Sequence, residues 1–435
     1  MMKIYEYKND SLETLLDALN KRSPEGQLEV ERATADIIRN VKERKDEALI
    51  EYSKKFDRVE LTIDTIEVPQ NELVSALNSI DRDLLRVIQK AAENIRTFHE
   101  KQKENSWFTT NENGILLGQK ITPLSRVGVY APAGSAPLPS TVLMDVIPAK
   151  VAGVEEIILC SPPSKGGKVD PVILACAKLA GADRVFMVGG AQAIAAMAYG
   201  TRIIPKVDKI VGPGNIYVAT AKKMVFGTCG IDMIAGPSEI LIIADETANP
   251  DYVAADLLSQ AEHDKLASSI LITTSKELAQ NVSQELAKQL LKLTRAEIAS
   301  ESVEKYGAII VTDTIYEAVE ISNLIAPEHL EVCTLNPFDL LPSIKNAGAI
   351  FLGNYSPEPL GDYFAGPNHT LPTSGTARFF SPLGVYDFIK RQSAISYSRD
   401  AFNAVASNVA AFAQAEGLTA HAEAIRIRQG NGGKK

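Results

Sequence analysis

The sequence predicts an α/β protein with two Rossmann-like parallel-sheet domains, a possible duplication, flanked by a helical N-terminal extension and a small C-terminal extension. Three observations lead to this fold class. Short β-rich runs alternate with Ala-rich helical stretches, the runs have Gly or Pro at their ends, and they fall into two series. Apolar strands separated by helices are typical of parallel sheets built from βαβ crossovers.

The composition limits the classes of protein to be considered. The chain has 435 residues, 45% of them hydrophobic, which is enough for more than one domain. The net charge is -9 and Lys and Arg form no dense cluster, so nucleic acid and membranes are poor partners. No stretch approaches the roughly 18 apolar residues that span a bilayer, and the N-terminus lacks a signal-peptide core. We therefore expect a cytoplasmic protein that acts on a small molecule.

The cysteines favour a reducing compartment. They are far apart and form no CxxC pair: Cys160, Cys176, Cys229 and Cys333. Three of them sit in apolar runs, where a reduced and buried Cys is the ordinary interpretation. A nucleophilic Cys stays open, although none has a His nearby in the sequence.

Residues 1–120 are expected to form a helix-rich N-terminal region, partly packed on the second α/β domain. Segments 11–22, 34–56 and 81–104 carry apolar residues at three-and-four spacing with charged faces between them. His99, in the last of these segments, is interpreted as a solvated surface residue.

The two α/β domains are assigned to residues 121–236 and 237–380. Strands of the first domain are expected in the runs RVGVYAP, EEIILCSPP, RVFMVGG and KIVGPG, and strands of the second in EILIIAD, SSILITT, GAIIVTD, HLEVCT and GAIFLG. Residues 353–376 form a long irregular segment, which in a compact protein is usually functional or disordered. Residues 381–435 complete the chain as a small helical C-terminal region, in which Lys434 and Lys435 are interpreted as a solvated tail.

Residues 249–264 contain the strongest local pattern. Asn249 is a good N-cap and Pro250 suits the first helical position, so a helix begins here. Gln260 and His263 are three residues apart on that helix and can reach one metal ion. Taken alone, a His that caps a helix C-terminus is the better interpretation, because Gln–x–x–His is common.

Three further patterns contain acids and histidines. Glu328 and His329 follow Pro327 at the mouth of an apolar strand, where they are well placed for proton transfer. A capping Glu and a half-exposed His would be the plainer interpretation of this pair. The other two patterns are Asp362 with His369 in the irregular segment, and Glu416 with His421 near the C-terminus.

Glycine-rich turns give a weak indication of a dinucleotide. Residues 129–140, 188–196 and 211–221 each pass from a strand through Gly or Pro into a helix, whose N-terminus can hold a pyrophosphate. None of the three turns is GxGxxG, so each is more readily interpreted as a tight turn.

Together these motifs resemble the histidinol dehydrogenase family. SQAEHD, APEHLEV, GDYFAGPNHTLPT, EGLTAH, VGPGNIYVA and GPSEI occur in the family's order and spacing, and the resemblance covers nearly the whole chain. It implies oxidation of L-histidinol to L-histidine, through bound L-histidinaldehyde, as the last two steps of histidine biosynthesis. It also implies two NAD+ consumed per substrate, one Zn2+ per active site, and a homodimer with shared sites in which residues 381–435 are exchanged.

The resemblance also implies roles for individual residues. His329 would be the general base and Glu328 the residue that activates water, while zinc positions the substrate. The zinc ligands would be Gln260, His263, Asp362 and His421, and all four would also contact the substrate, as would Glu328 and His329. Further substrate contacts would be Ser238, His369 and Glu416, and the NAD contacts would be Tyr130, Gln192 and Asn215.

Three other interpretations each fit part of this pattern. A related zinc and NAD dehydrogenase could oxidise another amino or sulfonated alcohol, but the matches at Ser238, His369 and Glu416 argue against it. A non-catalytic NAD- or metal-binding protein would have little reason to keep both Glu328 and His329. Zinc-dependent hydrolysis lacks its HExxH helix.

Overall fold

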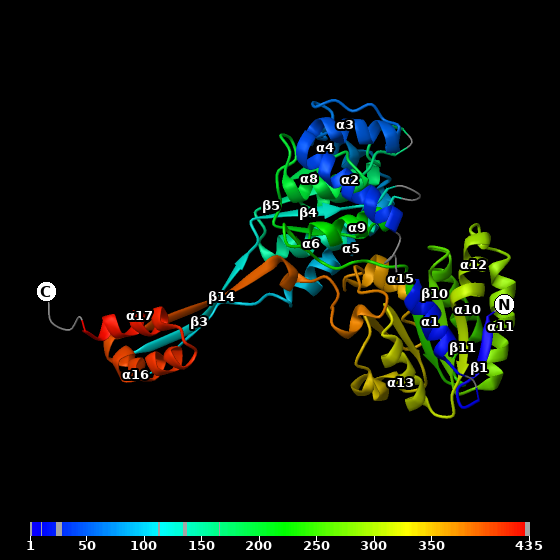
Figure 1. Ribbon diagram of the computed structural model, residues 1–435. Coiled ribbons are helices and arrows are strands. Elements are labelled where there is room, and N and C mark those ends of the chain that lie inside the picture. Colours follow the sequence, from blue (N-terminus) through cyan, green and yellow to red (C-terminus); the bar gives the residue numbers. More distant parts are fainter. Residues whose placement is uncertain are drawn as a thin grey trace. The chain divides into compact units, whose positions relative to one another are not determined.

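The computed structural model describes residues 2–9, 11–22, 28–111, 114–133, 137–164 and 166–430 (Figure 1). Two compact units divide the chain: Met1–Gln102 with Leu124–Phe388, and Lys103–Pro123 with Ile389–Lys435. Lys434 and Lys435, expected to form a solvated tail, lie outside the described residues. The domain boundaries expected from the sequence stay a prediction.

The first α/β domain contains a parallel sheet with the strand order β6-β5-β4-β7-β8. Its strands are β4 (Arg126–Tyr130), β5 (Glu156–Cys160), β6 (Arg184–Phe186), β7 (Lys209–Val211) and β8 (Gly230–Ile231). The helices between them are α6 (Pro139–Ala152), α7 (Pro171–Ala180), α8 (Gly190–Tyr199) and α9 (Ile216–Val225). These four helices alternate with the strands, as the sequence predicts.

Most of the N-terminal helices share a hydrophobic core with this first sheet. They are α2 (Leu28–Arg44), α3 (Asp46–Tyr52), η1 (Ser53–Asp57), α4 (Gln70–Ser79) and α5 (Arg82–Glu100). Val41, Leu49, Leu73 and Ile95 are fully or almost fully buried against residues of the first domain. The apolar residues that recur at three-and-four spacing in the sequence therefore form the face that these helices bury.

The second α/β domain contains a parallel sheet with the order β1-β11-β10-β9-β12-β13. Its strands are β1 (Lys3–Glu6), β9 (Glu239–Ala244), β10 (Ser268–Thr273), β11 (Gly307–Val311), β12 (His329–Cys333) and β13 (Ala349–Leu352). Numbered in chain order from β4 and from β9, five strands of each sheet share the order 3-2-1-4-5, as a duplication would produce, and β1 is added beside β11 in the second sheet. The predicted α/β class with parallel sheets is confirmed.

Helices pack on the second sheet, and short helical turns lie in the irregular segments that follow its last strand. The helical elements are α1 (Glu13–Lys21), α10 (Pro250–Ala261), α11 (Lys276–Leu290), α12 (Ala296–Tyr306), α13 (Ile315–Ile325), α14 (Pro337–Leu340), η2 (Leu341–Ser343), α15 (Glu358–Leu360), η3 (Gly361–Ala365), η4 (Thr376–Arg378) and η5 (Val385–Phe388). Asn249 caps α10 and Pro250 is its first residue, as predicted. Only short helical turns interrupt the segment 353–376, so its irregular character is also as predicted.

The second unit contains an antiparallel sheet, whereas the sequence pattern predicted mainly helical N- and C-terminal regions. β2 (Trp107–Thr110), β3 (Ile115–Pro123) and β14 (Ile389–Tyr397) pair in the order β14-β3-β2. Two helices follow, α16 (Arg399–Ala415) and α17 (Thr419–Gly430). Since β3 and β14 are far apart in the sequence, their pairing leaves no local signal.

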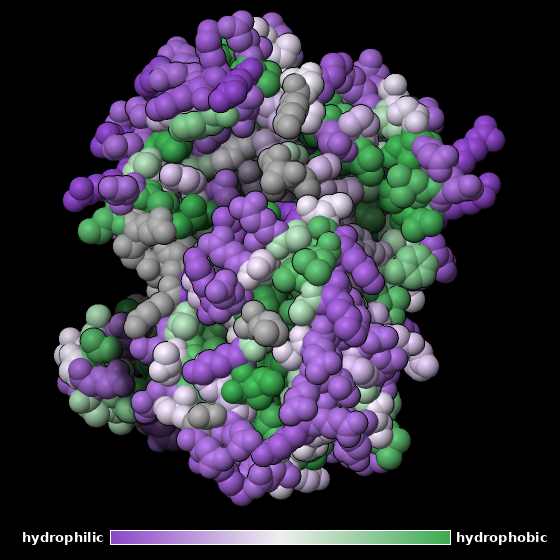
Figure 2. All heavy atoms as spheres, turned by 90° about the vertical axis from the view of Figure 1, so that its right-hand side faces the viewer, coloured by the Kyte–Doolittle hydropathy of each residue, from purple (hydrophilic) through white to green (hydrophobic). Residues whose placement is uncertain are grey.

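All four cysteines are buried and unpaired, as expected for the three in apolar runs. Within the described residues, no helix is both long and apolar enough to cross a membrane. Figure 2 shows one face of the molecule, on which hydrophilic side chains surround smaller hydrophobic patches.

The prediction that His99 is a solvated surface residue is wrong. His99 is fully buried, its Nδ1 lies 2.8 Å from the backbone oxygen of Ile95, and its ring meets the Phe98 ring edge-on. The charges around it in the sequence belong to the outer face of α5, whereas His99 continues the buried face of Ala92 and Ile95. Burial lowers the pKa of His99.

Replacing His99 by Gln should weaken the dependence of stability on pH. Because the folded-state pKa is lowered, only the unfolded chain takes up a proton as the pH first falls through about 6.5. The stability that neutral His99 contributes is therefore complete above that pH and declines below it. The Tm of the wild-type protein should fall more steeply than that of His99→Gln between pH 7 and pH 5. Parallel melting curves for the two proteins would contradict this expectation.

Candidate active site

Glu328 and His329 lie at the amino end of β12, beside Glu239 at the amino end of β9. His329 pairs in register with Ile240, so the two strands begin side by side. In doubly wound sheets, ligands usually bind beyond the carboxyl ends of the strands. The catalytic pair predicted from the sequence lies instead at the amino ends of the strands of the second sheet.

The tautomer of His329 is fixed by the backbone. Its Nδ1 lies 2.9 Å from the carbonyl oxygen of Glu239, and a carbonyl can only accept, so Nδ1 carries the proton. The other ring nitrogen, Nε2, is buried and has no hydrogen-bond partner among the described residues. Burial lowers the pKa of His329, which favours the neutral ring. The side chain therefore presents an unprotonated nitrogen, as a general base must.

Glu328 is held by the same residue. Its Oε2 accepts a hydrogen bond from the backbone N–H of Glu239 at 2.9 Å. Burial raises the pKa of the Glu328 carboxyl well above its usual range, and the nearby acids Glu239, Asp362 and Glu358 raise it further. A carboxyl with a raised pKa can exchange protons closer to neutral pH.

Glu239 is itself anchored by an ion pair to the N-terminal segment. Its Oε1 lies 2.5 Å from a guanidinium nitrogen of Arg22, and both side chains are almost completely buried. A second Arg22 nitrogen donates to the backbone oxygen of Leu266 at 2.9 Å. The residue whose peptide orients Glu328 and His329 is thus tied to the residue that follows α1.

Replacing Arg22 by Met should destabilise the protein strongly. The variant leaves the Glu239 carboxylate buried without its cation, which costs about 3 kcal/mol of unfolding free energy. Urea unfolding measures the effect. Arg39→Met is the matched control, because the Arg39–Asp36 pair is largely exposed, and removing such a pair costs about 1 kcal/mol or less. Equal losses in the two variants would mean that burial of the Arg22 pair does not matter.

The predicted metal ligands of the first unit come from two segments. Gln260 lies near the end of α10, and the N–H of His263, beyond that end, donates to the Gln260 backbone oxygen at 3.0 Å. The Gln260 side chain is buried, and in the part of the chain that the structure describes its Nε2 has no hydrogen-bond partner. Asp362 lies in η3, and burial raises its pKa well above the usual range, together with the charge of Glu358.

His329, Glu358 and Asp362 form a cluster of possible metal-binding side chains, with one ligand atom from each within 4.8 Å of the others. His329 Nε2 lies 3.8 Å from Glu358 Oε1 and 3.9 Å from Asp362 Oδ1. Only Asp362 belongs to the predicted ligand set. Sequence reasoning missed Glu358, although its spacing of four residues before Asp362, just after Pro357, was a usable signal.

Glu358 belongs to a buried group of three acids, together with Glu331 and Asp256. Its backbone N–H donates to Glu331 Oε1 at 2.7 Å, and Glu331 in turn shares a hydrogen bond with Asp256 of α10. Burial raises the pKa of Glu331 well above the usual range and that of Asp256 to about 6. These acids bring α10, β12 and α15 together beneath the site.

The remaining predicted substrate contacts fall in both units. Ser238 immediately precedes Glu239, and its backbone oxygen accepts from the N–H of Ser268 at 3.0 Å. Burial lowers the pKa of His369 to about 4, and His329 and His263 are close enough to lower it further. Glu416 directly follows α16 and His421 lies in the first turn of α17, so both belong to the second unit.

A cavity of about 500 Å³ is lined by His329, Asp362 and His369. Its other walls are mainly apolar and include Phe98, Phe338, Phe351, Leu360, Leu371 and Leu383. A largely apolar cavity with a few convergent polar groups is the usual form of a small-molecule site.

The three glycine-rich turns meet at the carboxyl edge of the first sheet. The N–H of Gly190 donates to the Tyr130 hydroxyl at 3.0 Å, and a Cβ on Gly212 would lie 2.2 Å from the Tyr130 backbone oxygen. Gln192 is buried in the first turn of α8, while Asn215 caps α9 through its side-chain oxygen. The structure therefore groups the three predicted NAD contacts, although Gly134–Ala136 of the first turn lie outside the described residues.

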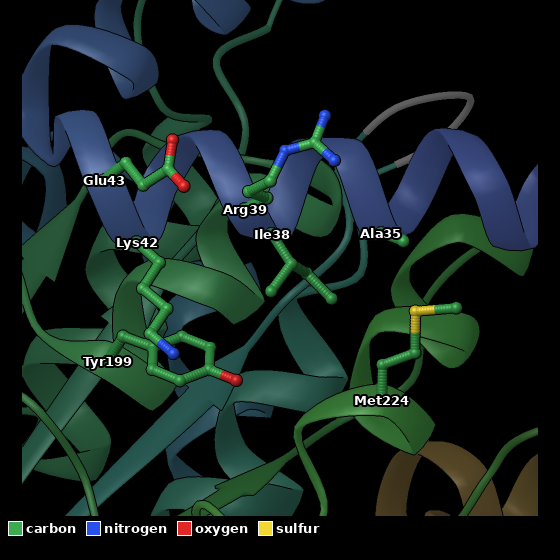
Figure 3. A pocket seen from close by; sticks show the side chains of 7 residues that line it. All are labelled: Ala35, Ile38, Arg39, Lys42, Glu43, Tyr199 and Met224. Carbon is green, nitrogen blue, oxygen red and sulfur yellow. The ribbon is translucent and has the colours of Figure 1, made fainter.

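A second hollow, of about 550 Å³, lies between α2, α8 and α9 (Figure 3). Lys42 lies over the Tyr199 ring at 5.2 Å from its centroid, and Ile38 and Met224 form part of the wall. None of the site residues predicted from the sequence lines it, and we assign it no role in the chemistry.

The chain is similar to known proteins over nearly its whole length. The family profile described as histidinol dehydrogenase matches residues 20–429. Histidinol dehydrogenase of Aquifex aeolicus is 57% identical over 98% of this chain and 100% of its own length. That of Clostridium acetobutylicum is 55% identical over 96% of each chain.

A solved structure extends the likeness to three dimensions. The crystal structure of histidinol dehydrogenase from Elizabethkingia anophelis aligns with a TM-score of 0.92 at 41% identity, over 98% of both chains. With the profile and the relatives matched over nearly their whole length, the chain belongs to the histidinol dehydrogenase family.

Proposed function

We propose that this protein oxidises L-histidinol to L-histidine in two successive NAD+-dependent steps, through L-histidinaldehyde that stays bound. The observation that carries the proposal is the state of His329: its Nδ1–H donates to the Glu239 carbonyl oxygen, while Nε2 has no hydrogen-bond partner among the described residues and the side chain lines the cavity. Membership of the histidinol dehydrogenase family supports the identity of the substrate.

The first step needs a base for the alcohol proton. His329 Nε2 has an available lone pair, and its neutral state is favoured by burial. NAD+, when bound, accepts the hydride. In the proposal His329 removes the hydroxyl proton as the C–H bond breaks, and the proton stays on Nε2 while Nδ1 remains bonded to Glu239.

The second step needs water, because an aldehyde must be hydrated before its carbon can lose another hydride. The Glu328 carboxylate accepts a hydrogen bond from the backbone N–H of Glu239, and its Oε2 lies 3.6 Å from His329 Nδ1. We assign Glu328 to removing a proton from that water, while His329 gives the proton held on Nε2 to the aldehyde oxygen; its Nε2 is then unprotonated and can act again as base on the hydrate. The raised pKa of Glu328 makes its carboxylate a stronger base than an exposed one.

The donor set of the site fits one zinc ion. Gln260, His263 and Asp362, with His421, would supply the mixed nitrogen and oxygen ligands that zinc accepts. The buried amide nitrogen of Gln260 supports this, because it has no hydrogen-bond partner among the described residues. Rotating the amide group by half a turn would place its oxygen at the same position, where it could bind zinc. Zinc, when bound, would hold the substrate's imidazole and amine in position. The chain's own residues, His329 and Glu328, would still carry the protons.

The second unit supports a homodimer with shared sites. Among its described residues, the buried hydrophobic side chains are alanines: Ala401, Ala406, Ala410 and Ala422. Large apolar side chains such as Trp107, Phe108, Ile395 and Phe412 are more than half exposed. A unit with so little core of its own needs a partner surface. We propose that a second copy of the chain covers it and that His421 and Glu416 complete the partner's site.

An assay of NADH release tests the function. With L-histidinol, the purified protein should release two NADH per substrate consumed, and a strong chelator should abolish turnover. Turnover of another amino alcohol but not of L-histidinol would point to a related dehydrogenase. Binding of NAD+ or zinc with no turnover of any alcohol would overturn the enzymatic proposal.

A further inference from the structure

The segment that carries His369 is anchored on the interior of α6. Asn368 and Thr370, on either side of His369, are almost completely buried, whereas His369 itself lines the cavity with His329 and Asp362. Asn368 Nδ2 donates to the backbone oxygen of Met144 at 2.6 Å, and Thr370 Oγ1 donates to Asp145 Oδ1 at 2.9 Å. Adjacent residues of one helix thus hold both neighbours of His369.

A proline explains why the Met144 carbonyl is available. Pro148 lies inside α6, four residues after Met144, and it has no N–H. In a regular helix that N–H would bond to the Met144 oxygen. Asn368 supplies the missing donor from another segment, and its own side-chain oxygen accepts from the N–H of Thr370 at 2.8 Å. The interior proline therefore creates the acceptor on which the His369 segment is held.

Asp145 gives the second anchor from a fully buried position. Within the described residues, its Oδ1 accepts from the Thr370 hydroxyl and its Oδ2 has no hydrogen-bond partner. Its other oxygen lies 3.0 Å from the place that a Cβ on Gly212 would take, against one of the glycine-rich turns. Burial raises the pKa of Asp145 to about 8, so near neutral pH it is mainly a neutral acceptor. A neutral amide at this position should accept the same hydrogen bond.

Helix α5 restrains the start of the same segment. Asn94 Nδ2 donates to the backbone oxygen of Phe364 at 2.8 Å. Gly366, with φ +114°, passes so close to α5 that a Cβ would lie 2.7 Å from the Asn94 oxygen. Positioned at both ends by neighbouring helices, the segment has little freedom to move His369.

We infer that Pro148, Asn368, Thr370 and Asp145 are positioning residues for His369, and that the missing helix hydrogen bond at Pro148 serves substrate binding. The inference rests on the proposed function, in which His369 contacts L-histidinol. It assigns a role to a helix proline that would otherwise only weaken α6. Loss of an anchor should raise the KM for L-histidinol without unfolding the protein.

Pro148→Ala separates positioning from stability. The restored N–H competes with Asn368 for the Met144 oxygen, so the KM for L-histidinol should rise by about tenfold, as expected for one buried hydrogen bond. The Tm should stay the same or rise, because an interior proline disfavours a helix. Pro171→Ala is the matched control, since Pro171 is the first residue of α7, where a proline removes no interior hydrogen bond; its KM should be unchanged.

Two pairs of conservative substitutions test the Asp145 anchor. Thr370→Val removes the hydroxyl and should raise the KM by about tenfold, whereas Thr370→Ser keeps it and should stay within about twofold of wild type. Asp145→Asn keeps a neutral acceptor and should also stay within about twofold, unlike Asp145→Ala. Equal effects of Thr370→Val and Thr370→Ser would overturn this anchor.

Hydrogen exchange gives a readout that needs no substrate. The amides of Gly366 and of residues 368–371 should exchange faster in Pro148→Ala and Thr370→Val than in wild type, and at the wild-type rate in Pro171→Ala and Thr370→Ser. Unchanged exchange and unchanged KM in Pro148→Ala overturn the inference whatever its Tm. If the wild-type protein fails to turn over L-histidinol, the proposed function falls, and the exchange rates alone still decide whether α6 holds the segment.

Discussion

Replacing His329 by Asn should lower kcat for L-histidinol by about a thousandfold, within the range for loss of a general base. Asn keeps a donor that can reach the Glu239 carbonyl but has no basic nitrogen to replace Nε2. Both oxidations should suffer, because each needs a proton removed from an oxygen on the reacting carbon. Single-turnover measurements of NADH formation, begun from L-histidinol and from L-histidinaldehyde, would show the two losses separately.

The metal content of the same variant decides between two ligand sets. His329 belongs to the cluster with Glu358 and Asp362, but it is absent from the set Gln260, His263, Asp362 and His421. As a base, His329 can be removed with zinc still bound, so His329→Asn should keep one zinc per site. Loss of zinc would make His329 a ligand and end its assignment as the base.

Two comparisons sharpen that experiment. His99→Gln also removes a buried histidine, but from a position that does not line the cavity, so it should keep the wild-type kcat. Glu328→Gln should impair oxidation of the aldehyde more than oxidation of the alcohol, since only the aldehyde must first gain water. An equal loss in both steps would count against the water-activating role of Glu328.

Local sequence patterns predicted the elements whose signals are local. The nine expected β-rich runs lie at the strands of the two parallel sheets, and Asn249 and Pro250 begin α10. Short apolar runs and capping residues define these features, and both are visible within a few consecutive residues of the sequence. The pairing of β3 with β14 depends on residues far apart in the chain, and no pattern in either strand pointed to it.

Burial of polar side chains was the hardest feature to predict. His99 was misjudged because its neighbours are charged, although its spacing from Ala92 and Ile95 places it on the buried face of α5. Nothing in the sequence near Arg22 or Glu239 indicates that they pair, and the buried ion pair that they form is seen only in the structure. Glu358 was missed for the same reason, because its chemistry depends on His329 and Asp362 from other segments.

The site residues differ in how they could be found. Gln260 and His263 share a helix end, so spacing alone suggested a ligand pair, but spacing could not separate it from a helix cap. The resemblance to histidinol dehydrogenases supplied the roles of Asp362, Glu416 and His421, which have no local pattern that implies them. Neither source pointed to Pro148, because a proline within a helix is normally interpreted only as a break.

Mixing two inactive variants should restore activity if His421 acts in the partner's site. His329→Ala and His421→Ala are each expected to lose nearly all turnover as homodimers. When they are unfolded together and refolded at equal amounts, half of the dimers should be mixed. Each mixed dimer has one site with both His329 and His421 intact, so about a quarter of the wild-type activity should return.

The complementation experiment tests the placement of the second unit without a structure of the dimer. A variant pair within the first unit, His329→Ala with Asp362→Ala, is the control, because both residues line the same cavity of one chain and no mixed dimer can contain an intact site. If the His421 pair also stays inactive while size measurements show that mixed dimers form, each site is built within a single chain. In that case the exposed apolar side chains of the second unit would serve only to hold the subunits together, and His421 would have to reach the metal of its own chain. Recovery for the His421 pair alone would instead explain why a unit with so little core is retained: its helices complete a neighbour's chemistry.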